Sequence, residues 1–130
     1  MKATVLIAVA DEPLAQRFQH FLRERGYQVA TAQDGPECLS KMRTHAPDVL
    51  ILDLELPWGG GDGVLARMRQ HLDTRWLPIV LLTGLTSRAT EAELAVPPVV
   101  RCLRKPFHLA ALLRSVSAAS AWSWGRVGLN

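Results

Sequence analysis

The chain has 130 residues, of which 48% are hydrophobic and 21% charged, a composition typical of a folded globular domain and unlike that of disordered or fibrous proteins. Its net charge is +3, but the 15 Lys and Arg residues are scattered and form no run, zinc-finger spacing or basic helix. The charge therefore favours a solvated basic surface over a nucleic-acid-binding one. Cys38 and Cys102 lie far apart without neighbouring ligand residues, which favours reduced thiols, although a disulfide stays open at this point.

The N-terminal half alternates apolar and amphipathic segments. TVLIAVA (4–10) is a continuous apolar run, which predicts a strand buried on both faces. This run is short for the apolar part of a signal peptide, and acidic residues follow it directly, so a strand is the better prediction. No segment of the sequence approaches the roughly 18 apolar residues of a membrane span. An amphipathic helix comes next, with Pro13 in its first turn and Gly26 at its end. A short strand over 27–32 and a second helix ending before Pro47 follow.

The C-terminal half continues this alternation. VLILDL (49–54) is the most apolar predicted strand, and the glycine-rich stretch PWGGGDG (57–63) after it predicts a loop. The remaining expected elements are helices over 63–72, 87–95 and 109–121 and strands over 78–84 and 99–105. Five strands that alternate with five helices predict an α/β fold of the doubly wound type, with a parallel sheet covered by helices on both faces.

Polar side chains stand at the ends of four predicted strands. Asp11 and Glu12 follow the first strand, Asp53 ends the third, Thr83 the fourth and Lys105 the fifth. In a sheet of order 2-1-3-4-5, the first and third strands are neighbours at the switch point where ligands bind. We therefore expect these side chains to line one cleft. Two carboxylates suit a hard cation, and a hydroxyl with an ammonium suits an oxyanion, so the cleft is suited to phosphoryl chemistry.

Four segments, in this order and at this spacing, resemble the receiver domain of bacterial two-component response regulators. They are VADEP (9–13), APDVLILDLELP (46–57) with GDG (61–63) downstream, PIVLLTG (78–84) and LRKPFHLAALLRSV (103–116). Each segment alone is a weak signal, whereas all four together are specific. The resemblance covers roughly Lys2 to Ala119 and implies a flavodoxin-like (βα)5 sandwich with the strand order 2-1-3-4-5.

The resemblance implies a role for each matching residue. Asp53 corresponds to the phosphate acceptor, and Asp11 to a magnesium ligand. The carboxylate of Asp53 and the backbone carbonyl of Glu55 complete the implied Mg²⁺ ligand set. Thr83 corresponds to the residue that hydrogen-bonds the phosphoryl group, and Lys105 to the residue that pairs with it.

The implied function is that of a signalling switch. A sensor histidine kinase or a phosphotransfer protein would donate the phosphoryl group, and a downstream protein or an output domain would receive the signal. We expect no enzymatic activity, no direct nucleic-acid contact and no membrane association, and a cytoplasmic location. Residues 1–121 are expected to form the receiver domain, and residues 122–130 a tail or the start of a linker. In this last segment, Trp122 and Trp124 either contact a partner, such as a second copy in a homodimer, or fold back over the domain. The Lys105–Pro106 bond is expected to be cis.

Three features depart from the family's usual pattern. Ala10 stands where the first of two adjacent acids is usual, which implies weaker Mg²⁺ binding, because a charge at about 4 Å is worth roughly 1 to 4 kcal/mol. Cys102 stands where the family usually has Tyr or Phe, whose ring changes rotamer together with the threonine when the domain switches. Cysteine is too small for this movement, so we do not expect the usual signal to pass through the fourth and fifth strands. The loop over 57–63 is longer than usual by about two residues. Within it Trp58 either covers the site or packs loosely, and the Glu55 side chain either joins the metal shell or points to solvent.

Two other classes of function stay open. A pseudo-receiver keeps the fold but acts as a protein-interaction module without phosphate, and Ala10 and Cys102 favour this alternative. A phosphatase that forms its own aspartyl-phosphate would need Asp53 and Glu55 as its nucleophile and acid, but the sequence has no substrate-capping insertion. Phosphate incorporation at Asp53 separates the first two classes, and turnover of a phosphomonoester would reveal the third.

Overall fold

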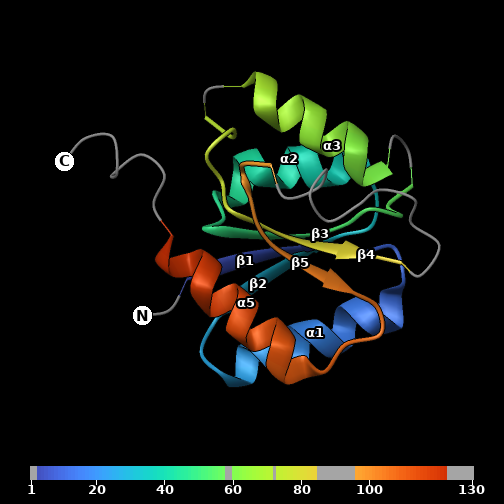
Figure 1. Cartoon of the computed structure of the whole chain (residues 1–130), viewed down its shortest axis with the longest axis vertical. Helices are drawn as coiled ribbons and strands as arrows, with labels where there is room; N and C mark the ends of the chain where they lie inside the picture. Colours follow the sequence, from blue (N-terminus) through green and yellow to red (C-terminus); the bar gives the residue numbers. More distant parts are fainter. Residues whose placement is uncertain (1–2, 58–59, 72, 85–95, 123–130) are drawn as a thin grey trace.

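In the computed structural model, a parallel five-stranded sheet lies between two layers of helices (Figure 1). The structure describes residues 3–57, 60–71, 73–84 and 96–122. The strands are β1 (Thr4–Ala8), β2 (Gln28–Ala32), β3 (Val49–Asp53), β4 (Ile79–Thr83) and β5 (Val99–Arg104). The helices in the described ranges are α1 (Glu12–Glu24), α2 (Gly35–His45), α3 (Gly60–Gln70) and α5 (Leu109–Ala121).

The strand order is β2-β1-β3-β4-β5, and every neighbouring pair is parallel. This confirms the predicted doubly wound order. Helices α1 and α5 cover one face of the sheet, and α2 and α3 cover the other (Figure 1). The predicted helix over 87–95 lies outside the described residues. Since all strands run in one direction, their carboxyl ends meet at one edge, with the switch point between β1 and β3.

The strands alternate their side chains between two hydrophobic clusters. Leu6, Leu50 and Leu81 belong to the cluster under α2 and α3, whereas Ile51 and Val80 belong to the cluster under α1 and α5. Every residue of β3 and β4 is buried. A central strand covered on both faces needs no polar alternation, which explains the continuous apolar runs.

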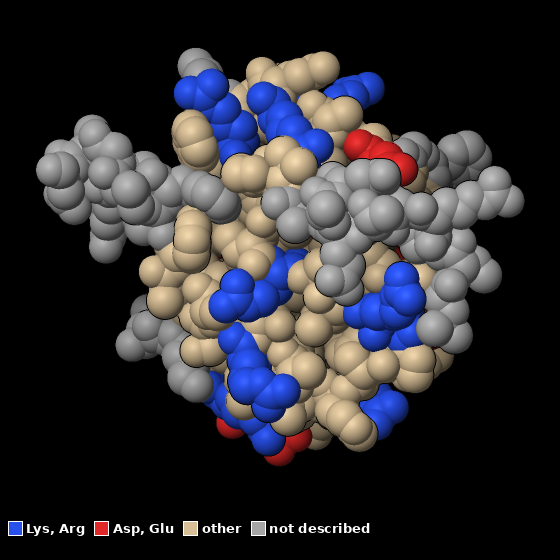
Figure 2. All heavy atoms as spheres, viewed as in Figure 1, with Lys and Arg blue, Asp and Glu red and all other residues tan. Residues whose placement is uncertain are grey.

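The surface charge is dispersed. On the face seen in Figure 1, Lys and Arg side chains spread from α3 across β5 to α5, with uncharged surface between them, and do not gather in one patch (Figure 2). This distribution agrees with the scattered basic residues of the sequence. None of the described helices is long and apolar enough to cross a membrane.

Both cysteines are free thiols, as predicted. Cys38 lies on the buried face of α2, where burial, followed by the nearby charges of Asp34 and Glu37, raises the pKa of its thiol to about 12. A thiol with this pKa stays protonated near neutral pH and is a poor nucleophile. Cys102 on β5 is half-buried against the same cluster.

The glycine-rich segment is not the loop that the sequence predicts. Helix α3 begins at Gly60 rather than Gly63, so most of these glycines form its first turn. The Gly61 N–H donates to the Leu54 carbonyl at 3.1 Å, and a Cβ on Gly61 would lie 2.7 Å from the Leu54 Cα and 2.8 Å from the Asp53 carbonyl oxygen. Glycine therefore lets the start of α3 rest directly on the chain that leaves β3. Trp58 lies outside the described residues.

Two glycines of this turn should respond oppositely to alanine. Gly61→Ala should lower the free energy of unfolding by about 1–3 kcal/mol, because its Cβ meets backbone atoms that cannot move aside easily. Gly63→Ala should raise it by about 0.5–1 kcal/mol, because among the described residues a Cβ there meets nothing within 4 Å and alanine favours the helix. Urea denaturation measures both changes. Destabilisation by both substitutions would contradict this account of the turn.

Candidate functional site

The candidate site is built around Asp53, the last residue of β3. It ends the central strand at the carboxyl edge of the sheet, and the residue is only 4% exposed. A buried carboxylate costs several kcal/mol unless a cation and hydrogen bonds satisfy it. Here Oδ2 accepts from Lys105 Nζ at 2.5 Å and Oδ1 accepts from the backbone N–H of Glu55 at 2.9 Å. Both carboxylate oxygens are thus held in a defined orientation.

Lys105 reaches Asp53 from the other side of β4. It follows β5 directly, and its backbone N–H donates to the carbonyl of Thr83 at 2.8 Å. Its side chain is 25% exposed, so the ammonium lies at the boundary between the core and solvent. Thr83 ends β4 and is itself buried. The structure therefore brings the ends of β3, β4 and β5 together around one ion pair, and the Lys105–Pro106 bond is cis, as predicted.

The end of β1 contributes a more exposed group. Asp11 is the N-cap of α1, and its Oδ1 accepts from the backbone N–H of Leu14 at 3.2 Å. Ala8 is in register with Leu52, so the chain beyond Ala8 lies at the same sheet edge as Asp53. Ala10 is exposed and presents only a methyl group there. In the part of the chain that the structure describes, no three His, Cys, Asp or Glu side chains gather as a metal-binding group.

The Glu55 side chain is exposed and lies against the chain that leaves β4. A Cβ on Gly84 would collide with Glu55 Oε1, so glycine leaves room for this carboxylate. Sequence reasoning left open whether the Glu55 side chain joins a metal shell or points to solvent, and it did not predict either contact of Glu55. A negative charge consequently lies on the β4 side of the site.

A cleft of about 540 Å³ adjoins the site between α1 and the segment that joins β5 to α5. It is lined by Leu14, Arg17, Phe18, Lys105, Pro106, Phe107, His108 and Leu109. The rings of Phe18 and Phe107 stack in its wall at 5.8 Å between centroids. Because Lys105 both lines the cleft and pairs with Asp53, the cleft opens onto the candidate site. Sequence reasoning missed it because its two walls are far apart along the chain.

Residues 5–117 match the response regulator receiver domain family, which covers most of the chain. The protein belongs to this family. Receiver domains are signalling domains, and response regulators interact with histidine kinases and output domains.

Two curated relatives and two solved structures illustrate the match. Rrf1 of Nitratidesulfovibrio vulgaris is 31% identical over 121 residues, which cover 93% of this receiver domain chain and 85% of Rrf1. Response regulator RR06 of Streptococcus pneumoniae is 30% identical over 114 residues, which cover 88% of this chain but 51% of RR06. The chain thus spans only about half the length of RR06.

Among the solved structures, chemotaxis response regulator CheY4 of Vibrio cholerae superposes with a TM-score of 0.81 at 32% identity, over 92% of this chain and 99% of CheY4. The receiver domain of the Francisella response regulator 1452 has a TM-score of 0.83 at 27% identity, over 92% of this chain and 97% of that one. Sequence and fold therefore agree on the receiver family.

Removal of the Lys105 ammonium should show how much the Lys105–Asp53 ion pair stabilises the fold. Lys105→Met leaves the buried Asp53 carboxylate without its positive partner and should lower the free energy of unfolding by about 2 kcal/mol or more. Asp53→Asn in the same background removes the unpaired charge, so the double variant should lose less than the sum of the two single variants. A double-mutant cycle in urea measures this coupling. Additive losses would show that the two side chains do not stabilise each other.

Proposed function

We propose that this protein is a phosphorylatable receiver in two-component signalling, with Asp53 as its phosphate acceptor. A sensor histidine kinase or a phosphotransfer protein is the donor, and the phosphorylated domain changes its contacts with a downstream protein or output domain. One observation carries the proposal. The Asp53 carboxylate is buried at the switch point of the sheet, is oriented by the Glu55 N–H, and pairs with Lys105 beside Thr83.

This arrangement suits nucleophilic attack by a carboxylate. The Glu55 N–H holds Oδ1 of Asp53, which fixes the direction in which the carboxylate faces an incoming donor. A new bond forms between an Asp53 oxygen and phosphorus as the bond between phosphorus and the donor breaks. Lys105 is already next to the reacting oxygens, so its ammonium would pair with the anionic phosphoryl group. Thr83 then supplies a hydroxyl donor for a phosphoryl oxygen.

The donor atoms at the site fit a weakly held magnesium ion. Asp11 and Asp53 offer carboxylate oxygens, and Glu55 offers a backbone carbonyl, which is the oxygen-only donor set that hard cations prefer. When bound, Mg²⁺ offsets the repulsion between the Asp53 carboxylate and the anionic phosphoryl group. Ala10 provides no carboxylate where the family usually has a second acid, and the Asp11 carboxylate already accepts a hydrogen bond as the N-cap of α1. These two facts support binding at higher Mg²⁺ concentrations than a fuller acidic cluster would need.

The cleft beside Lys105 is the proposed docking site for the phosphate donor. A donor has to reach Asp53 from the open sheet edge, and this cleft presents the stacked Phe18 and Phe107 rings directly next to that edge. The half-buried Phe107, stacked on the buried Phe18, leaves some apolar surface beside the proposed acceptor, which favours a protein donor over a small molecule alone. Residues 1–121 are taken as the receiver domain and 122–130 as a tail or linker, in keeping with the end of α5 at Ala121.

Intact-protein mass after incubation with acetyl phosphate and Mg²⁺ tests the acceptor. The wild-type protein should gain one phosphoryl group, and Asp53→Asn should gain none, because an amide oxygen is a far weaker nucleophile. A gain in both proteins would move the acceptor to another residue. No gain in a wild-type sample that also fails to bind Mg²⁺ or beryllium fluoride would favour the pseudo-receiver, which Ala10 and the half-buried Cys102 support.

A substitution that restores the missing charge tests the metal site. Ala10→Asp should shift the Mg²⁺ dependence of phosphorylation to lower concentration, by roughly fivefold if the added charge is worth about 1 kcal/mol. Ala10 is exposed, so the larger side chain has room. Ala10→Asn is the matched control, with the same shape and no charge. Equal Mg²⁺ dependence in these two variants would contradict a charge effect at this position.

A further inference from the structure

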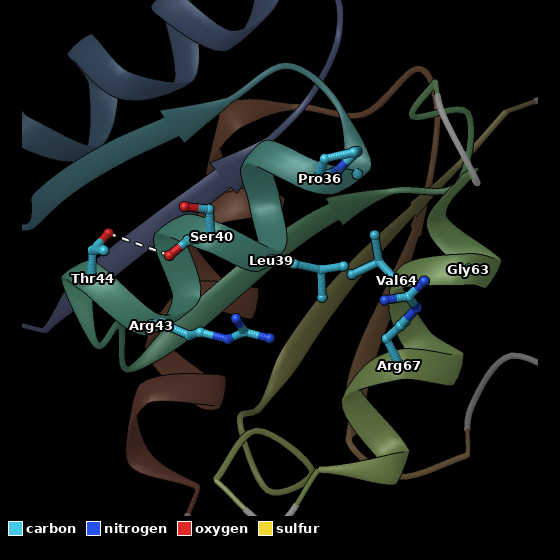
Figure 3. A pocket seen from close by; sticks show the side chains of 9 residues that line it. Pro36, Leu39, Ser40, Arg43, Thr44, Gly63, Val64 and Arg67 are labelled. Atoms are coloured by element: carbon cyan, nitrogen blue, oxygen red, sulfur yellow. Dashed lines mark hydrogen bonds between the residues drawn. The ribbon is translucent and has the colours of Figure 1, made fainter.

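A second recessed surface lies in the other helix layer, away from the cleft that adjoins Lys105. A groove of about 620 Å³ runs between α2 and α3 (Figure 3). Leu39 of α2 and Val64 of α3 point toward one another across it and form an apolar floor. The guanidinium groups of Arg43 and Arg67 project into the space between the two helices. The groove therefore combines an apolar centre with two cations.

The two cations lack a partner within the described parts of the chain. Arg43 and Arg67 are both exposed, and neither takes part in the ion pairs found among the described residues, which are His20–Glu24, Lys41–Glu37 and Lys105–Asp53. No Asp or Glu is among the described residues that line the groove. Guanidinium groups bind carboxylates through paired hydrogen bonds. The charge of the groove is therefore complementary to an acidic partner.

Gly63 provides an independent observation about the same groove. It lines the α3 side, and a Cβ there would meet nothing within 4 Å among the described residues. This contrasts with Gly61 two positions earlier, where a Cβ would meet backbone at 2.7 Å. A glycine inside a helix costs about 1 kcal/mol relative to alanine. Packing within the described chain does not require this glycine, whereas an occupant of the groove would benefit from the space.

We propose that this α2–α3 groove binds an acidic amphipathic helix of a partner protein. Apolar side chains of that helix would cover the half-buried Leu39 beside the buried Val64, and its carboxylates would pair with Arg43 and Arg67. A helix laid into a groove between two helices is a common recognition mode. The groove is open and its arginines are exposed, so one small anion would gain little, whereas a helix adds apolar burial to two charge pairs.

This surface is separate from the proposed phosphate donor site. The groove lies on the α2 and α3 face of the sheet, and the cleft that contains Phe18 and Phe107 lies on the α1 and α5 face (Figure 1). The two surfaces have no lining residue in common. The proposal therefore holds whether or not Asp53 is phosphorylated.

Site-specific photocrosslinking in cells that express the protein natively tests the groove and its occupant. The photoreactive probe p-benzoylphenylalanine replaces Ser40, an exposed residue of the groove, in the full chain. The matched control carries the same probe at Ser117, an exposed serine of α5 in the opposite layer. The Ser40 probe should join one partner protein through a peptide rich in Asp and Glu with apolar residues at helical spacing, and the Ser117 probe should not.

Three further variants examine the physical basis of this adduct. Arg43→Glu with Arg67→Glu should reduce its yield at least tenfold, because both attractions become repulsions. Gly63→Gln should reduce it comparably by filling the groove with a neutral side chain that suits a helix. Arg114→Glu, an exposed arginine of α5, should leave the yield unchanged. Urea denaturation midpoints no lower than that of the unsubstituted protein show that the variants remain folded.

Several outcomes would overturn the proposal. They are an adduct that also forms at Ser117, a joined peptide that is neutral or basic, a yield that survives the arginine reversal, and an adduct to lipid, nucleic acid or a second copy of this chain. Absence of any adduct specific to Ser40 would also overturn it.

Discussion

Everything at this site depends on the placement of a buried carboxylate at the end of the central strand of the sheet. Asp53 ends a strand whose every residue is buried, so its charge has to be met by a cation from within the fold. Lys105 meets it only because β5 lies two positions away in the sheet and β4 ends between them. The backbone bond from Lys105 to Thr83 fixes that approach. The ion pair thus links three strand ends, and it gathers the groups on which the proposed phosphoryl transfer depends.

The core and the site are consequently parts of one arrangement. The two hydrophobic clusters hold the strands rigidly, and a reacting group carried on a rigid strand end keeps its orientation without support from a loop. Gly61 extends this arrangement to α3, whose first turn rests on the backbone at Leu54. Gly84 does the same for the Glu55 side chain. Gly61 and Gly84 therefore stand where backbone or a carboxylate passes close to the site.

The two helix layers give the domain two different surfaces. The α1 and α5 layer carries an aromatic cleft that meets the reacting edge, whereas the α2 and α3 layer carries a groove with an apolar floor and two arginines. The sheet separates these two surfaces, so the proposed donor site and the proposed partner site share no lining residue. The proposed donor site and the proposed partner site thus lie on opposite faces of one sheet in a small domain.

The sequence by itself determined the strands and most of the polar groups at their ends, and its resemblance to the receiver family implied the strand order. Continuous apolar runs predicted buried parallel strands, and polar residues at their ends predicted that Asp53, Thr83 and Lys105 share the carboxyl edge of the sheet. Only the tertiary structure decided that α3 begins at Gly60, that the Glu55 N–H orients Asp53, and where the cleft and the groove lie. Apolar periodicity shows which side of a helix is buried, but it does not specify where along its axis the helix meets a strand end. That position depends on contacts between segments that are distant in the chain.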